Sequence, residues 1–360
     1  MAIIDKPSDY FNTKLYTGDG NSTQAITGVG HQPDLVWLKN RSDGTWHQLI
    51  DAVRGTGATY TLASNSNEAE GGGATNQYGF ISAIGSDGFT VSAGSSNASV
   101  VNHNGNNYAS WNWKAGTSFT NDASATGIGT IDSSGSVNDT AGFSIVSYTG
   151  NGSSGATIKH GLSTAPKIII AKNRQRAADW LVFSSSMSSN GDYALFLQST
   201  SAKDNSQDYW GDTAPTSSVF SVGNRQENNQ SGENIIAYCF AEKQGYSKFG
   251  SYLGFNSGAY GPFIYTGFKP AFVLIKDSSA ANAWTIRDDK RNTFNPATNF
   301  LMPDASDAEV TAGEAVDILS NGFKIKANGG KVQDSGNTYI YMAFAENPFV
   351  ASNFVPATAR

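Results

Sequence analysis

The 360-residue chain contains one cysteine and few charged side chains. Cys239 alone excludes an intrachain disulfide and a zinc site built from several cysteines, and its place in the apolar run IIAYCFAE indicates a small buried side chain. No run of Lys or Arg exceeds two residues and the formal net charge is −6. The sequence therefore lacks the basic footprint of a nucleic-acid-binding protein.

Long apolar segments are also missing. No stretch approaches the length of a membrane span, so we expect no membrane insertion, and the N-terminal residues MAIIDKPSDYF lack the basic and apolar regions of a signal peptide. Charged residues make up only 15% of the chain and aromatic residues 12%, a balance that argues against disorder. The apolar segments are short and are separated by Gly, Ser and Asn residues, and the chain has 39 glycines. This pattern predicts an all-β protein.

One stretch of the sequence occurs three times. QPDLVWLKNRSDGTW begins at residue 32, APKIIIAKNRQRAADW at residue 165 and KPAFVLIKDSSAANAW at residue 269. Aligned on the proline, each copy has a Lys six residues later and a Trp 13, 14 or 14 residues later. The repeated positions are Pro33, Lys39 and Trp46 in the first copy, Pro166, Lys172 and Trp180 in the second, and Pro270, Lys276 and Trp284 in the third.

Further matches on both sides extend the repeat into a triplication of the whole chain. They include YTG, YTG and YLG upstream and Phe89, Phe220 and Phe323 downstream. The units cover residues 1–120, 121–244 and 245–360, each the length of a β-sandwich domain. We expect three tandem β-sandwiches in series, each with its own core and able to fold alone. The Ser/Thr/Gly-rich start of unit two predicts a linker that leads into an early strand, and the short second connection predicts that units two and three keep a fixed relation.

The repeated stretch itself predicts a strand. Proline suits a strand entrance, and the residues that follow, DLVWLK, KIIIAK and AFVLIK, are apolar on both faces, as expected of a central strand covered on both sides. We interpret Lys39 as the exposed end of this strand, with its stem over the sheet. Trp46 is interpreted as a core side chain opposite it.

Catalytic patterns are weak in this sequence. The four histidines share no position in the repeat, unit three has none, and no Gly-x-Ser-x-Gly motif occurs. The acidic residues are dispersed, without a carboxylate pair common to the units. We therefore predict no enzyme activity, catalytic residue, cofactor or metal centre; a lone Ca²⁺ site in the loops at 65–70 or 102–107 stays open.

Aromatic residues without a counterpart in the other units are the candidates for ligand binding. Rings that keep their register through the triplication are predicted to form the core. The remaining candidates, for which we expect exposed loop positions, are Trp37, Tyr108, Trp111, Tyr209 and Trp210. The first three lie on predicted strands, so burial is the alternative for them.

The sequence from residue 9 to 55, DYFNTKLYTGDGNSTQAITGVGHQPDLVWLKNRSDGTWHQLIDAVRG, resembles a domain family that recurs in tail-fibre-like and other virion structural proteins of marine and cyanobacterial phages. GFSIVSYTGNGSSGATIKHGLSTAPKIIIAKNR, from residue 142, resembles the second copy typical of those proteins, and unit three, with KDS in place of KNR, matches less. The resemblance implies jelly-roll sandwiches of the concanavalin or laminin-G type and brings no catalytic residues.

The function that the resemblance implies is attachment to a host. The chain would be a non-enzymatic tail fibre or receptor-binding protein in a virion assembled in the host cytoplasm. Its partners would be other virion proteins and a host surface glycan or protein, and a homotrimer is expected from the family. A capsid decoration protein is the alternative, and a glycan-degrading fibre is a third reading.

Overall fold

The computed structural model of the protein describes residues 3–72, 77–255, 261–327 and 329–349. In these residues the helical segments are short: α1 (Ala123–Thr126), α2 (Gln226–Asn229) and the 3₁₀ turns η1 (Pro7–Asp9) and η2 (Ala58–Tyr60). The other regular elements are strands, which confirms the predicted all-β class. Within the described residues, no helix is long and apolar enough to cross a membrane.

The first unit contains two antiparallel sheets. The larger has the strand order β1-β7-β3-β4 and the smaller the order β2-β6-β5. The strands are β1 (Phe11–Thr17), β2 (Thr23–Thr27), β3 (Leu35–Asn40), β4 (Gln48–Asp51), β5 (Phe80–Gly85), β6 (Gly88–Ser92) and β7 (Asn107–Trp113).

The second and third units repeat the order of the larger sheet, as β10-β16-β12-β13 and β17-β23-β19-β20. The second unit has β8 (Thr117–Asn121), β9 (Ser133–Asn138), β10 (Phe143–Thr149), β11 (Ala156–Lys159), β12 (Ile168–Asn173), β13 (Leu181–Ser184), β14 (Leu195–Phe196), β15 (Val219–Val222) and β16 (Asn234–Phe240). The third has β17 (Ser247–Leu253), β18 (Phe263–Tyr265), β19 (Phe268–Asp277), β20 (Thr285–Asp288), β21 (Val316–Leu319), β22 (Gly322–Ile325) and β23 (Thr338–Pro348). The smaller sheets are β11-β15 and β18-β22-β21.

The repeated stretch forms an inner strand in each unit, as predicted. Every residue of β3, β12 and β19 is buried, because each strand has sheet neighbours on both sides and apolar layers on both faces. Pro33 and Pro166 stand just before their strands. Pro270 lies inside β19, where the pairing with β23 shifts register, a place where the missing N–H interrupts no regular ladder.

The start of the predicted linker after unit one is instead part of a sheet. β8 pairs with β9, which pairs with β10, so this Ser/Thr-rich segment extends the main sheet of the second unit to seven strands. The second group of strands therefore begins before the predicted boundary at residue 121. The new edge strand β8 is mostly exposed, and small polar residues suit a solvated sheet edge.

Each unit has its own apolar layer between its two sheets. In the first unit Val36 and Ile50 of the main sheet pack with Phe89 and Val91 of the smaller one, and separate clusters occupy the corresponding places in the second and third units. One face of every main sheet is covered in this way. The alternation of side chains along a strand leaves the opposite face to be covered by something else.

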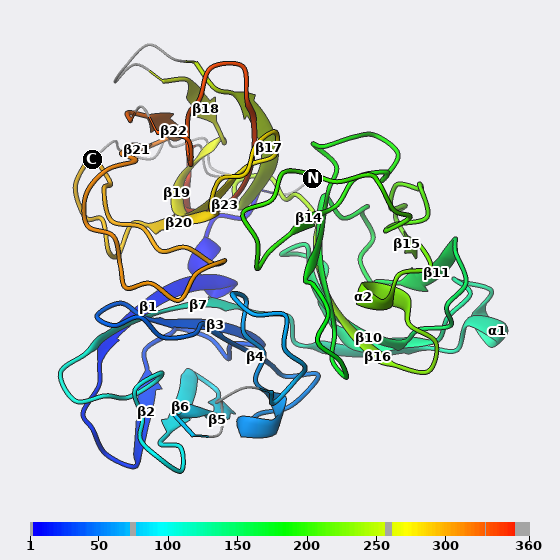
Figure 1. The fold of residues 1–360 in the computed structure, drawn as a ribbon, viewed down its shortest axis with the longest axis horizontal. Helices are drawn as coiled ribbons and strands as arrows, with labels where there is room; N and C mark the ends of the chain where they lie inside the picture. The colour runs from blue at the N-terminus through cyan, green and yellow to red at the C-terminus, as the bar shows by residue number, and fades with distance from the viewer. Residues whose placement is uncertain (1–2, 73–76, 256–260, 328, 350–360) are drawn as a thin grey trace.

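The opposite faces of the three main sheets cover one another. A single hydrophobic cluster draws on all three units, and at its centre lie Trp113, Phe240 and Phe344. Their ring centroids are 5.6, 5.9 and 6.2 Å apart and all three pairs are edge-to-face. These rings occupy the same position of β7, β16 and β23, so the units surround a pseudo-threefold axis (Figure 1). The expected arrangement in series is wrong.

A ring of equivalent hydrogen bonds joins each unit to the next. The bonds run from Trp180 Nε1 to Ala63 O (2.9 Å), from Trp284 Nε1 to Phe196 O (3.0 Å) and from His47 Nε2 to Met302 O (3.0 Å). β4, β13 and β20 each begin one residue after these donors, so the counterpart of the two tryptophans is His47. Trp46 is therefore not the repeated core residue that its spacing suggested, and it is only partly buried.

The tryptophan ring missing at position 47 is replaced from a neighbouring strand. Trp37 Nε1 donates to His47 Nδ1 (3.0 Å), which leaves the ring proton of His47 on Nε2. The positions equivalent to Trp37 hold Ile170 and Leu274. In the first unit the tryptophan thus stands on β3 and the smaller side chain stands just before β4, whereas the other two units have the reverse arrangement.

Transplanting the arrangement of the second unit into the first tests this exchange. We expect Trp37→Ile alone to cost about 2–4 kcal/mol by leaving a cavity, and His47→Trp alone to cost about 1–3 kcal/mol by overpacking. The double variant should be more stable than either single variant, because the volumes compensate. Urea denaturation of the four proteins measures the coupling, and additive losses would contradict the proposed equivalence.

Two of the three unit interfaces contain the same buried ion network. Arg54 of the first unit pairs with Asp51 (2.5 Å) and Glu70 (2.7 Å), Glu70 pairs with Arg174 of the second unit (2.7 Å), and Tyr238 donates to Asp51 (2.8 Å). The third and first units repeat this set with Arg291, Asp288, Glu309, Arg41 and Trp111. Arg41 in the first copy of the repeated stretch is therefore an interface residue.

The third interface replaces this set as a group. At the positions of Asp51, Arg54, Glu70, Arg174 and Tyr238 stand Ser184, Met187, Lys203, Ser278 and Met342. The equivalence of the loop position rests on a shared backbone bond, since the N–H of Glu70, Glu309 and Lys203 donates to the carbonyl of Arg174, Arg41 and Ser278 respectively. Ser278 stands directly after β19, where the other two interfaces have an arginine. An arginine has no acidic partner here, because the residues across the interface are uncharged or, at Lys203, positively charged.

Candidate ligand-binding pocket

The five aromatic residues predicted to lie on exposed loops are buried. The exposed fraction is 3% for Trp37, 0% for Tyr108 and Trp111, 5% for Tyr209 and 1% for Trp210. Trp37 and Trp111 belong to the central core, and the other three belong to the inner layers of their units. The prediction of exposed positions is wrong, and the alternative of burial is confirmed for Trp37, Tyr108 and Trp111. Two of the five rings do have aromatic counterparts in register, since Tyr238 stands at the position of Trp111 and Tyr339 at that of Tyr108.

The repeated lysines are interior residues. Lys39, Lys172 and Lys276 are fully buried, so the reading of Lys39 as an exposed strand end is wrong. Each Nζ donates to the carbonyls one and four residues later; for Lys39 these are Asn40 O (2.8 Å) and Asp43 O (3.2 Å). Burial lowers the pKa to about 7 for Lys39 and to about 8 for the other two. The lysine holds the turn that follows its strand.

In the first unit this turn forms one wall of a surface pocket. Asn40 Oδ1 accepts from the N–H groups of Ser42 (2.9 Å) and Asp43 (3.1 Å), an Asx turn. Its Nδ2 donates to Ser99 O on the opposite side (2.8 Å). Lys39 and Asn40 together therefore set the path of the chain from β3 to Trp46.

The pocket has a volume of about 320 Å³ and lies in the first unit, beside the start of β4 and just before β5. Trp46 and Tyr78 are its partly exposed aromatic residues. None of the side chains that line it carries a charge at neutral pH: Gly44, Thr45, Trp46, His47, Gln48, Tyr78, Ser99 and Val100. It has the size and the mainly apolar lining of a small-molecule site.

Two polar atoms of this lining have no hydrogen-bond partner. Gln48 is 1% exposed and its Nε2 donates to Gly79 O (2.6 Å). That bond fixes the orientation of the amide, because a carbonyl accepts only from the NH₂ end. Gln48 Oε1 and Thr45 Oγ1 are then buried without a partner among the described residues. Leaving a buried acceptor without a partner costs about 1–3 kcal/mol.

His47, one of the lining residues, is a neutral group. Burial, followed by the ammonium of Lys39, lowers its pKa well below the usual value. The pocket therefore stays uncharged throughout the neutral and mildly acidic range.

The same shift makes the stability of the protein fall in acid. The unfolded chain takes up a proton on His47 near pH 6.5 and the folded chain does not, so stability decreases as the pH falls below that value. Below that pH, His47 should lower the free energy of unfolding by about 1.4 kcal/mol for each pH unit. The double variant Trp37→Ile/His47→Trp lacks this imidazole, so the free energy of unfolding of the wild type minus that of the double variant should fall between pH 7 and pH 5. A constant difference would contradict a neutral His47.

The remaining candidates for chemistry are few. Burial raises the pKa of the Cys239 thiol, which makes it a poor nucleophile. Within the described ranges, no group of three or more His, Cys, Asp or Glu side chains could hold a metal ion.

Trp46 satisfies the criterion that failed for the five buried rings. Its counterparts, one residue before the donors of the hydrogen-bond ring, are Asp179 and Ala283. Aligning the copies on the strands that begin at Gln48, Leu181 and Thr285, instead of on the tryptophans, would have marked Trp46 as unique to the first unit.

The fold and the pocket define an all-β protein with three sets of sheets around a shared core and a neutral aromatic pocket in one of them. The chain belongs to the family described as Domain of unknown function (DUF7483), which it matches over residues 6–348. One family domain thus spans all three units. Comparison with curated proteins and with solved structures found no match.

Proposed function

We propose that the protein is a non-enzymatic receptor-binding component of a phage virion, of the tail-fibre type, that attaches to a host surface glycan or protein. The observation that carries the binding role is the Trp46 pocket, an open aromatic site on a body whose other described tryptophans are buried. The resemblance of residues 9–55 and 142–174 to virion structural proteins supports the virion setting.

The proposed architecture is three jelly-roll sandwiches of the concanavalin or laminin-G type, covering residues 1–120, 121–244 and 245–360. The recurring order of the main sheets and the separate inner layers support it. The shared central core gives such a body the rigidity that attachment under load requires. The homotrimer implied by the resemblance stays a proposal, which the native mass of the protein tests.

Competition for the host surface tests this function. Purified protein, added to host cells before the phage, should reduce adsorption in a dose-dependent way, because it occupies the receptors. Immunogold labelling of particles should mark the tail; labelling of the capsid shell would support the decoration protein instead. Release of new reducing ends from host glycan would support the glycan-degrading reading.

A further inference from the structure

We propose that the pocket beside Trp46 binds an uncharged pyranose sugar, with the indole ring of Trp46 against the sugar face and with Thr45 and Gln48 as hydrogen-bond partners of its hydroxyls. The proposal deepens the proposed function by naming the ligand class of its site, and only the biological source of the sugar rests on that function.

The exposure of Trp46 is the first argument. All seven tryptophans lie in the described residues, and the other six are at most 3% exposed. Trp46 is partly exposed and faces a pocket together with Tyr78. Flat, amphipathic rings at a pocket mouth suit a ligand that has an apolar face and a polar rim, and a pyranose ring has both.

The unpartnered atoms are the second argument. Gln48 Oε1 is a pure acceptor and needs a donor from the ligand, and Thr45 Oγ1 can donate or accept. Both atoms are buried in the ligand-free protein, so the side chains of Thr45 and Gln48 have to turn toward the ligand, and a ligand with several neighbouring hydroxyls then satisfies both atoms. A carboxylate or phosphate is disfavoured, because it offers no proton to Gln48 and meets no Lys or Arg in the lining.

The rigidity of the pocket is the third argument. Its walls are joined by the bonds from Asn40 to Ser99 and from Gln48 to Gly79, so the shape of the pocket and the position of Trp46 exist before the ligand arrives. At the positions of Gln48 the other units have Leu181 and Thr285. The ring and the amide thus occur together in the first unit and in neither of the others.

Acrylamide quenching of the full-length protein tests the proposal. Trp46 should account for most of the quenchable fluorescence, and binding of a sugar should protect it. The probes are the methyl pyranosides of glucose, galactose, mannose and N-acetylglucosamine, with glucuronic acid as the charged comparison. We expect protection by at least one neutral sugar and none by glucuronic acid.

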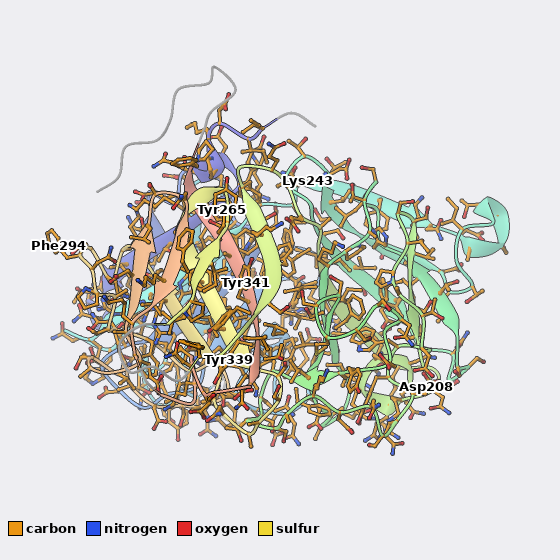
Figure 2. The ribbon with its side chains drawn as sticks, turned by 90° about the horizontal axis from the view of Figure 1, so that it is seen from above. Asp208, Lys243, Tyr265, Phe294, Tyr339 and Tyr341 are labelled. Atoms are coloured by element: carbon orange, nitrogen blue, oxygen red, sulfur yellow. The ribbon has the colours of Figure 1, made fainter. Side chains whose placement is uncertain are left out.

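Variants separate a binding role from a structural one. Calorimetric titration with the protecting sugar should show about tenfold weaker binding for Trp46→Ala and severalfold weaker binding for Thr45→Val. Thr45→Val should melt at or above the wild-type temperature, because the hydroxyl it removes has no partner. Phe294→Ala is the matched control: Phe294 is 86% exposed and projects from the third unit (Figure 2), and its removal should leave binding unchanged.

The possible outcomes distinguish the two proposals. Protection by neutral sugars without any block of phage adsorption would support the pocket and overturn the attachment function. Block of adsorption by Trp46→Ala as strong as by the wild type would support attachment and overturn the host surface as the source of the sugar. Protection by none of the neutral sugars, or equal affinity of Trp46→Ala and the wild type, would overturn the sugar site.

Discussion

A protein made of residues 116–244 alone, the complete second unit, should not form a stable monomer. Its main sheet would expose the face that the other units cover in the full chain, a face that includes Phe143, Ile168, Ile170, Trp180, Val182, Leu195, Leu197, Ile236, Tyr238 and Phe240. Each fully buried apolar side chain of this kind contributes about 1.5–3 kcal/mol. The loss exceeds the about 5–15 kcal/mol of net stability of a typical domain. Circular dichroism melting and light scattering after size exclusion measure the outcome.

This expectation replaces the one from the sequence, in which each unit folds alone. The matched control is the chain cut after residue 115, with both pieces produced together, because the central core should reassemble them into a complex with cooperative melting. A homotrimer of the isolated unit would agree with the need for partner faces. A monomeric fragment with a sharp thermal transition would show that the central core is dispensable.

Replacing Arg54 by methionine should destabilise the protein by about 3–5 kcal/mol. Arg54 and Asp51 have no exposed side-chain surface, and Arg54 also contacts Glu70 and Tyr238. Burial opposes the charge of Arg54, but the carboxylates of Asp51 and Glu70 keep its pKa above the usual value. Without the guanidinium, Asp51 is left buried without a counter-charge, and Glu70 keeps only its pair with Arg174. Urea denaturation at pH 7 gives the change in free energy of unfolding.

The third interface supplies the control for this prediction. The set Asp51→Ser, Arg54→Met, Glu70→Lys, Arg174→Ser and Tyr238→Met copies the residues that the second and third units place at the same positions. It should stay within about 2 kcal/mol of the wild type, because no charge is left without a partner. A loss as large as that of the single variant would indicate that methionine volume, and not the unpaired carboxylates, causes the damage.

The inner strands were predictable from particular residues. In DLVWLK, KIIIAK and AFVLIK the residues on both faces of the strand are apolar, apart from the polar ends. Only a strand between two apolar layers needs that pattern. The same apolar faces did not say what lay against them. The sequence at Leu35 and Trp37 does not show whether these side chains pack against a sheet of their own unit or against the sheets of the two other units.

The pocket was not predicted, because a spacing that differs by one residue hid its main side chain. Trp46 and Trp180 match by residue type, whereas His47 and Trp180 match by position before the strand and by the hydrogen bond that each donates. Aligning the copies by residue type therefore placed Trp46 one residue out of register. The strand starts carry the geometric equivalence, since side chains alternate from one face to the other at each residue.

The sequence by itself determined the all-β class, the triplication, the inner strands and the absence of a common catalytic pattern, because these depend on composition and on local periodicity. Only the tertiary structure decided that the three main sheets enclose one core, that Lys39 and Arg41 are interior and interface residues, and that Trp46 opens onto a pocket. The reason is that an apolar sheet face is satisfied by any apolar partner. Which partner it meets depends on contacts between residues more than a hundred positions apart, such as Trp113, Phe240 and Phe344.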